Sequence, residues 1–195
     1  MRLGVIRSTI SLNRLPFCLL LFCITLSAQE RTLPQQKLGK NTSPMSTTEV
    51  SEDAFHLTLP GKWTTEEAAD SARWNYRSED GREGLTVSLM TSKDRMNPEK
   101  QRGTLNRMAE LHRKVVTKVF GPAALTMYDT TFGETNGVMA ARYGGTETAT
   151  HRRFHSLLLC SPLAVTVFFY EAVGLPEKEA DARAKAIMNS IAVPK

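Results

Sequence analysis

Cysteine is scarce in this chain of 195 residues. It has three cysteines, and two of them, Cys18 and Cys23, lie in an N-terminal segment that we expect to be removed. Cys160 alone then remains, which excludes an internal disulfide in the mature protein. A domain without disulfides is held together by its core, and the remaining 167 residues (195 minus 28) are enough for one domain to bury one.

An excess of one charge is lacking as well. The formal net charge is +5, but this value includes Arg2, Arg7 and Arg14 of the N-terminal segment. The mature chain therefore carries only +2 (five minus three). This excludes the strong basic footprint of a nucleic-acid-binding domain, so we expect no nucleic acid among the partners.

Residues 1–28 differ in composition from the rest of the chain. They contain three arginines and no acid, then an apolar run of 12 residues from Leu15 to Leu26, and they end in Ser27-Ala28. This pattern predicts a cleavable secretory signal peptide, with a mature protein that begins at Ala28 or Gln29. The run is shorter than the ~20 residues of a spanning helix, and a retained N-terminal anchor is the alternative. We therefore expect an exported protein, periplasmic or secreted, that meets the membrane only through this segment if it is uncleaved.

The next part of the chain divides into a polar segment and a patterned one. Residues 29–50 are polar, include two prolines and show no periodicity, which predicts a flexible linker. Residues 51–195 form the predicted folded domain. Phe55, Leu57 and Leu59 alternate in a strand that ends at Pro60-Gly61, and alternation recurs in two further segments, 73–77 and 85–89. The first third of this domain is thus predicted to be an antiparallel meander.

Two helices are predicted. Asn97-Pro98-Glu99 is a helix start, and Gly121-Pro122 is a stop. The predicted packing stripe of this helix is Leu105, Met108, His112, Val115 and Val119. A second start follows Leu175-Pro176, and the predicted packing stripe of this terminal helix is Ala180, Ala184, Ile187, Met188 and Ile191.

The segment between the helices predicts strands: one near 125–132, one from Val138 to about Gly144, one over 150–160 and one over 163–172. Asn136-Gly137 suits a tight hairpin, and Ser161-Pro162 separates the last two strands. The last strand is apolar on both alternating faces except at Thr166. A strand of this kind is covered on both sides, so it is predicted to lie near the middle of the sheet. The apolar run from Leu157 to Tyr170 is too short and too broken for a membrane span.

The predicted fold class is therefore α+β, a mostly antiparallel sheet covered by helices on both faces. The opening Phe-x-Leu-x-Leu-Pro-x-x-Trp (Phe55 to Trp63), the meander, the long helix, the run of strands and the final Ile-Met-Asn-Ser-Ile (Ile187 to Ile191) resemble the Mog1/PsbP-like family. Its members include a Ran-binding nuclear protein, photosystem II extrinsic proteins and exported bacterial domains. The resemblance covers residues 51–195 and implies this sandwich, without shared catalytic residues to carry over.

The histidines carry the sharpest chemical patterns. His112 lies in the apolar stripe of a helix, and its sequence neighbours indicate neither an orienting acid nor a nucleophile. We interpret it as a core histidine with a satisfied hydrogen bond. His151 and His155 would share a zinc-binding face on a helix, but on a strand they stand ~13 Å apart, so no metal site is predicted. With Arg152 and Arg153 they could form a rim that contacts an anion or a peptide. The alternative is the solvated end of a strand.

The remaining candidates each have a simpler interpretation. Cys160 follows three leucines and is interpreted as a buried, inert thiol rather than a nucleophile. Ser156 and Ser161 lack the Gly-x-Ser-x-Gly elbow of hydrolases, and the glycines near 133–137 and 144–145 lack phosphate-loop spacing. Trp63, Trp74 and Tyr76 could line a groove, although aromatics in a small sheet are more often core. No catalytic, cofactor-binding or metal-binding residue and no cofactor is therefore predicted.

Three hypotheses of function remain. The first is an exported, non-catalytic binding or accessory domain that acts in the cell envelope or outside the cell, on an unknown protein or small-molecule ligand. The second is an enzyme, hydrolase-like, whose residues are dispersed over the sheet face. The third is a membrane-tethered structural domain. Converging titratable side chains in a pocket would favour the enzyme, and a groove without them would favour the binder.

Overall fold

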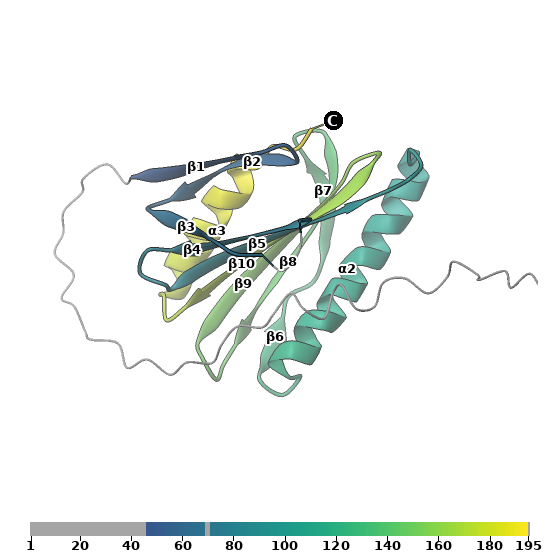
Figure 1. Cartoon of the computed structure of the whole chain (residues 1–195). Coiled ribbons are helices and arrows are strands. Elements are labelled where there is room, and N and C mark those ends of the chain that lie inside the picture. The colour runs from purple at the N-terminus through teal and green to yellow at the C-terminus, as the bar shows by residue number, and fades with distance from the viewer. Residues whose placement is uncertain (1–45, 69–70, 195) are drawn as a thin grey trace, which may run out of the picture. The chain divides into compact units, whose positions relative to one another are not determined.

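The computed structural model describes residues 46–68 and 71–194 (Figure 1). The predicted signal peptide and residues 29–45 of the predicted linker lie outside the described residues. The element order is β1 (Thr47–Glu52), β2 (Phe55–Pro60), β3 (Trp63–Glu66), β4 (Arg73–Ser78), β5 (Glu83–Thr91), α2 (Pro98–Phe120), β6 (Leu125–Met127), β7 (Thr131–Thr135), β8 (Val138–Glu147), β9 (Arg152–Cys160), β10 (Ala164–Val173) and α3 (Glu177–Ser190).

The main sheet has eight strands, and all of its pairs are antiparallel. Its order is β3-β4-β5-β10-β9-β8-β6, and β7 pairs with β8 beside β6. Strand β10 pairs with β5 on one side and β9 on the other, so it lies in the middle of the sheet. The prediction that the apolar 163–172 segment is a central strand is confirmed.

The two helices cover opposite faces of this sheet (Figure 1). Helix α2 packs on β8 and β9, whereas α3 packs on β2 and on the other side of β9. Adjacent residues of β10 therefore meet different layers. The ring of Phe169 lies 5.8 Å from His112 of α2, and the ring of Phe168 lies 5.6 Å from Phe55 of β2. The α+β class with helices on both faces is confirmed.

The largest apolar cluster fills the side of α3. It joins α3, the β1–β2 hairpin and the main sheet, and its buried residues include Phe55, Leu57, Leu59, Leu85, Val87, Leu157, Phe168, Ile187 and Ile191. This cluster explains why the Phe-x-Leu-x-Leu motif alternates, because the three side chains of β2 point together into it. Within the described residues, no helix is long and apolar enough to cross a membrane.

The N-terminal strands differ from the prediction. Strand β1 begins at Thr47, inside the segment predicted as linker, and with β2 it forms a separate two-stranded sheet. The predicted meander therefore comprises β3 to β5 only. The reason is a second partner of β2, in addition to β1. The backbone of His56 exchanges two hydrogen bonds with Ala192, which follows α3. This C-terminal contact binds the hairpin to α3 rather than to the main sheet.

The helix ends and the hairpin agree with the sequence signals. The Asn97 side chain accepts a hydrogen bond from the backbone of Lys100 at 2.8 Å, and Gly121 ends α2. Asn136 and Gly137 have φ values of 51° and 77°, as a tight β7–β8 turn requires. The predicted strand over 125–132 is wrong in extent, since β6 and β7 are separate strands that pair with different ends of β8.

The packing stripe of α2 is also shifted from the predicted one. The buried residues are Gln101, Leu105, Ala109, His112 and Val116, whereas Met108 and Val115 are half-buried and Val119 is exposed. The small side chain of Ala109 lies in the middle of this stripe and lets the helix approach the sheet closely. In α3 the predicted stripe is confirmed, with Ala180, Ala184, Ile187 and Met188 buried on the helix and Ile191 buried just after it.

Candidate functional site

Polar side chains gather on the α2 side of the sheet, beyond the strands that α2 covers. Alternate residues of β4 and β5, together with one residue of β10, point to this side in adjacent register. We call this set the polar face; it consists of Arg73, Asn75, Arg77, Thr86, Ser88 and Glu171. Helix α2 packs on β8 and β9, away from β4 and β5. Among these residues, Asn75, Arg77 and Thr86 are half-buried polar side chains on a part of the sheet that α2 does not cover.

Glu171 is the most unusual member of the polar face. It is only 3% exposed, although it is charged at its ordinary pKa. Its Oε1 lies 3.6 Å from Nη1 of Arg77, and its Oε2 lies 3.5 Å from Nη1 of Arg152. Burial raises the pKa of Glu171, and the two arginines oppose that rise. The arrangement thus holds one buried carboxylate between two guanidinium groups.

Gly84 makes room for this arrangement. It lies between Arg77 and Glu171 in the register of β4, β5 and β10. A Cβ atom at this position would lie 2.9 Å from Nη1 of Arg77 and 3.3 Å from Oε1 of Glu171. A side chain here would displace the Arg77 guanidinium, so glycine favours the close approach of Arg77 and Glu171.

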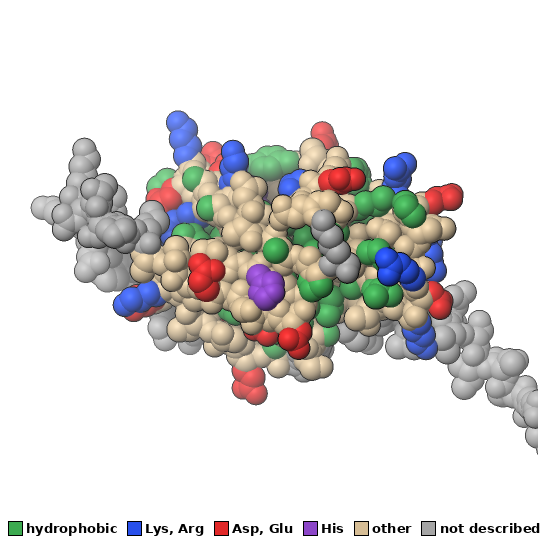
Figure 2. Space-filling view, turned by 90° about the horizontal axis from the view of Figure 1, so that it is seen from above, with side chains coloured by type: hydrophobic (Ala, Val, Ile, Leu, Met, Phe, Trp, Pro, Cys, Tyr) green, Lys and Arg blue, Asp and Glu red, His purple; other side chains and the backbone are tan. Residues whose placement is uncertain are grey.

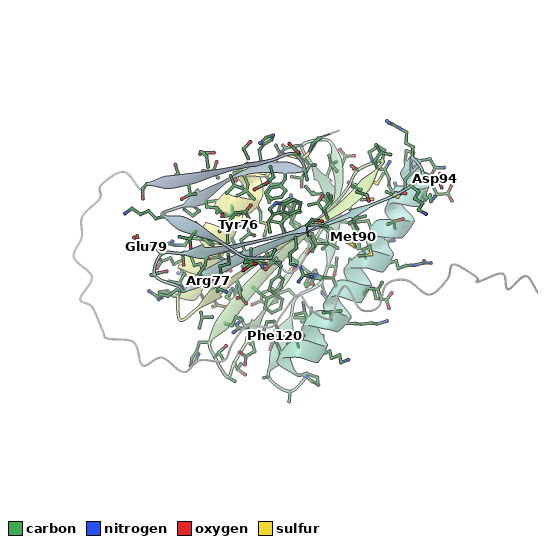
Figure 3. The ribbon with its side chains drawn as sticks, viewed as in Figure 1. Tyr76, Arg77, Glu79, Met90, Asp94 and Phe120 are labelled. Carbon is green, nitrogen blue, oxygen red and sulfur yellow. The ribbon has the colours of Figure 1, made fainter. Side chains whose placement is uncertain are left out.

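The two arginines differ in their surroundings. The Arg152 side chain is 14% exposed, and its guanidinium lies 4.9 Å from the ring centre of Phe120 at the end of α2. The Arg77 side chain is 24% exposed, and its Nε lies 3.4 Å from Glu66 at the sheet edge. Figure 3 shows Tyr76 and Arg77, neighbours on β4, on opposite sides of the strand. Arg77 is thus the member of the pair that solvent reaches.

Two polar atoms of this site have no hydrogen-bond partner among the described residues. They are Oε2 of Glu171 and Nε of Arg152, and both are buried. Burying an unsatisfied polar atom costs about 1–3 kcal/mol. A hydroxyl group can donate to the carboxylate and accept from the guanidinium at the same time. Because both atoms are enclosed by the fold, a buried water molecule is the group that would satisfy them.

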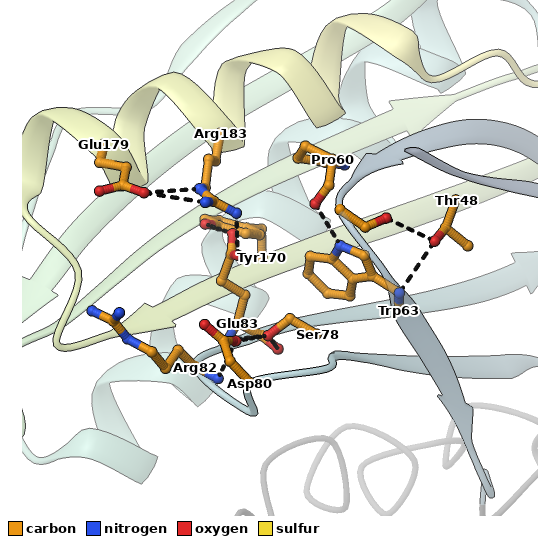
Figure 4. A network of polar contacts seen from close by, with 11 residues as sticks. Thr48, Pro60, Trp63, Ser78, Asp80, Arg82, Glu83, Tyr170, Glu179 and Arg183 are labelled. Carbon is orange, nitrogen blue, oxygen red and sulfur yellow. Dashed lines mark hydrogen bonds and ion pairs between the residues drawn. The ribbon is translucent and has the colours of Figure 1, made fainter. Parts of the chain in front are cut away.

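The α3 side also has a buried carboxylate, but both of its oxygens accept hydrogen bonds. Glu83 accepts hydrogen bonds from the Tyr170 hydroxyl and from Arg183 Nη1, both at 2.7 Å, and Arg183 also bonds to Glu179 (Figure 4). Burial raises the pKa of Glu83, and its two donors oppose the rise. Both carboxylate oxygens are satisfied within the fold. This network joins α3 to β5 and β10, and its donors already occupy both oxygens of Glu83.

The predicted rim of His151, Arg152, Arg153 and His155 is not formed. Arg152 and Arg153 are neighbours on β9 and point to opposite faces. Arg153 makes a two-point contact with Asp181 of α3 at 2.6 and 2.7 Å, and His155 Nε2 lies 2.8 Å from the same carboxylate. The alternative of a solvated strand end holds for His151, which is exposed, but not for Arg152 and Arg153, which are half-buried in ion pairs.

His112 is a core residue, as interpreted from its place in the helix stripe. It is 4% exposed, and its Nδ1 lies 2.5 Å from the Tyr143 hydroxyl. Burial lowers the pKa of His112 to about 4, so the imidazole is neutral at neutral pH. No carboxylate of the described residues bonds to it, and it points from α2 toward the sheet, among Tyr143 and Phe169. A base in this position would have no access to a substrate.

The other sequence candidates are buried or, for Trp74 and Ser161, half-buried. Burial raises the pKa of the Cys160 thiol to about 11, and Ser156 lies under α2. Trp63 and Tyr76 are core residues, and the ring of Trp74 packs 5.1 Å from Phe55, so these aromatics line the core and not a groove. In the part of the chain that the structure describes, no group of three or more His, Cys, Asp or Glu side chains could hold a metal ion.

Sequence reasoning missed the polar face, although a signal was present. Glu171 is the single charged residue within an otherwise apolar strand, β10. An acid in a strand covered on both sides must have a partner or a function. Arg77 and Gly84 lie opposite it only through the strand register, which joins β10 to β5 and β4 across 94 residues of sequence (171 minus 77).

Comparisons with known proteins identify the fold. No protein-family model matches the chain, and no curated protein sequence matches it. The solution structure of cyanobacterial PsbP (CyanoP) from Synechocystis is similar, with a TM-score of 0.60 and 11% identity over 81% of this chain and 98% of that chain.

Two weaker likenesses accompany it. A protein of Bacteroides thetaiotaomicron has a TM-score of 0.46 and 9% identity over 72% of this chain and 45% of that one. LpqN of Mycobacterium tuberculosis, which is involved in cell envelope biogenesis, has a TM-score of 0.36 and 15% identity over 78% of this chain and 87% of that one. The likeness to CyanoP covers nearly all of that protein. The chain therefore has the Mog1/PsbP-like fold, as its strand and helix order indicates.

Proposed function

We propose that this protein is an exported, non-catalytic binding or accessory domain that acts in the cell envelope or outside the cell. The ligand is a small hydroxyl-bearing molecule held on the polar face. The observation that carries this proposal is the guanidinium of Arg77, which is partly exposed and contacts the buried carboxylate of Glu171 beside the half-buried Asn75 and Thr86. A ligand hydroxyl can accept a hydrogen bond from this guanidinium.

Burial of the possible nucleophiles favours binding over hydrolysis. Ser156 and Cys160 are both buried beneath α2 or at the end of β9. Hydrolysis by covalent catalysis requires a nucleophile within hydrogen-bond reach of a base and open to substrate. A buried carboxylate between two arginines lacks such a nucleophile and serves orientation and hydrogen bonding instead.

A thermal-shift screen against mono- and disaccharides tests the binding proposal. We expect at least one compound to raise the melting temperature, because a ligand that binds only the folded state stabilises it. Glu171→Gln and Arg77→Gln should each abolish the shift. Lys62→Gln, at an exposed position on the β2–β3 connection, is the matched control and should keep it. Equal shifts in all four proteins would reject the polar face as the site.

Export is tested separately. The short apolar run from Leu15 to Leu26 supports a cleavable signal, and N-terminal sequencing of protein recovered from the envelope or medium should begin at Ala28 or Gln29. Recovery of a chain that still begins with Met1 from the membrane fraction would favour the tethered structural domain instead.

A further inference from the structure

Charge is divided unevenly between the layers of the fold. Helix α2 carries six basic and two acidic side chains, a formal charge of +4, whereas the other described residues carry 12 basic and 16 acidic ones, a formal charge of −4. The β1–β2 hairpin, in the layer across the sheet from α2, has three acids and no basic residue between Thr47 and Pro60. Figure 2, seen from above Figure 1, shows charges of both signs scattered without a patch. The positive side of the domain is therefore α2.

The basic side chains of α2 form a line. Lys100, Arg107 and Lys114 are spaced by seven residues, and Lys118 follows one turn later, so all four lie along one outward strip of the helix. All four are exposed. We call them the basic ridge. Seven residues of helix span about 10.5 Å, and the whole ridge is about 27 Å long.

The ridge is only partly neutralised by its neighbours. Lys114 pairs with Glu110 at 2.6 Å, but the Lys114 side chain remains 69% exposed. A surface pair of this kind contributes little and exchanges readily with an external anion. No described ion pair joins Lys100, Arg107 or Lys118 to an acid. Three cations of the ridge are thus available and the fourth can be shared.

The ridge offers no apolar surface. Large exposed apolar side chains among the described residues are Val119, Tyr128, Phe132 and Leu163. Of these, only Val119 belongs to α2, and it lies near its end, on the side that holds the buried stripe. Helices that bind lipid surfaces place their apolar face in the membrane, but the apolar face of α2 packs on β8 and β9. A charged partner is favoured over a lipid surface.

We propose that the basic ridge binds a linear acidic polysaccharide laid along α2. Lys100, Arg107 and Lys114 recur every two helical turns, which matches the length of two sugar units in an extended chain with a carboxylate on alternate sugars. The charges of the described residues sum to zero, +4 on α2 and −4 elsewhere, so the strong basic footprint of a nucleic-acid-binding domain is absent. This interaction is independent of the polar face, which takes a small ligand.

Hyaluronan, which has one carboxylate in each pair of sugars, is the probe. We expect the folded protein to bind it by titration calorimetry at low salt, and the affinity to fall as salt screens the charges. A ridge variant with Lys100→Gln, Arg107→Gln, Lys114→Gln and Lys118→Gln should lose at least about tenfold in affinity. All four positions are exposed, and urea unfolding checks that the variant folds.

A second variant provides the matched control. Lys62→Gln, Lys93→Gln, Lys178→Gln and Lys185→Gln remove the same formal charge from exposed positions outside α2. Its affinity for hyaluronan should stay within about twofold of the unchanged protein, since distant exposed charges are screened. An equal loss in the two variants, no binding of hyaluronan, or tighter ridge-dependent binding of duplex DNA or of phosphatidylglycerol vesicles would overturn the proposal.

Discussion

The buried carboxylates on the two faces of the main sheet differ in the hydrogen bonds that they accept. On the α3 side, Glu83 has a donor for each oxygen, and the surrounding cluster is apolar and continuous. On the α2 side, Glu171 has two arginines at 3.5 and 3.6 Å and one oxygen without a hydrogen bond. A fold can satisfy a buried acid completely, which stabilises the structure, or incompletely, which keeps hydrogen-bonding capacity for a buried water molecule.

The same contrast extends to the helices. Helix α3 is fastened by charge: Arg183 binds Glu83, and Asp181 receives Arg153 and His155. Helix α2 is fastened by aromatic packing, through stacked rings from Phe120 to Phe154 to Phe169 and then His112. Arg113 of α2 donates to the Tyr128 carbonyl and to Thr130, but the other cations of α2 are exposed. Helix α3 uses charged side chains in contacts with the sheet, whereas α2 presents most of its charged side chains at the surface.

The largest expected effect tests whether both faces are equally packed. Phe168→Ala and Phe169→Ala should each reduce the free energy of unfolding by about 3–5 kcal/mol, because each ring is buried against a different layer. Phe168 is 0% exposed and Phe169 is 7% exposed. Urea unfolding of the single variants measures the losses. A loss below about 1 kcal/mol for Phe169→Ala would mean that α2 covers its face only loosely.

Acidification should weaken the α2 side through His112. The folded-state pKa of His112 is about 4, below its ordinary 6.5, so the neutral form stabilises the fold above pH 6.5 and this stabilisation is lost as pH falls toward 4. The loss reaches about 3 kcal/mol, at about 1.4 kcal/mol for each pH unit between the two values. Comparing urea unfolding of the unchanged protein and His112→Gln at pH 7 and pH 4.5 isolates this contribution. An identical pH dependence would show that His112 takes up its proton without unfolding.

The two buried carboxylates provide a matched pair of substitutions. Glu83→Gln should cost about 1–3 kcal/mol, because it removes a charged acceptor from Arg183 and Tyr170. Glu171→Gln should change the stability by less than about 1 kcal/mol, because one carboxylate oxygen makes no hydrogen bond and the charge is desolvated. Chemical unfolding at pH 7 gives both values. Equal losses would show that the fold satisfies Glu171 as fully as Glu83.

The architecture could be predicted because it depends on local patterns. The caps at Asn97 and Gly121, the Asn136-Gly137 turn and the two-sided apolar pattern of 163–172 each fix one element, and the structure has all of them. The β1–β2 hairpin was missed because the second partner of β2, Ala192, lies 136 residues from His56 (192 minus 56). Alternation identifies a strand but does not specify its neighbours.

The site escaped prediction for a related reason. Its parts come from β4, β5, β9 and β10, and only the register brings Arg77, Gly84 and Glu171 into one row. The failed rim at Arg152 and Arg153 shows the opposite error, since residues adjacent in a strand point to different faces. Each of these arginines serves a separate layer, one beside Glu171 and one beside Asp181. Adjacency in sequence was a poor guide to adjacency in a site.

The smallest effect concerns Cys160, which lies on the α2 side at the end of β9. The thiol is fully buried, and burial raises its pKa to about 11, so little thiolate forms at pH 7. We expect a thiol reagent to label the native protein slowly and the urea-unfolded protein at once. Labelling of Cys160 without denaturant then reports local opening of this end of the sheet. Faster labelling in Phe169→Ala than in Phe168→Ala, at matched urea, would place that opening under α2, whereas stoichiometric labelling of the unchanged protein within seconds would show that this face is already open.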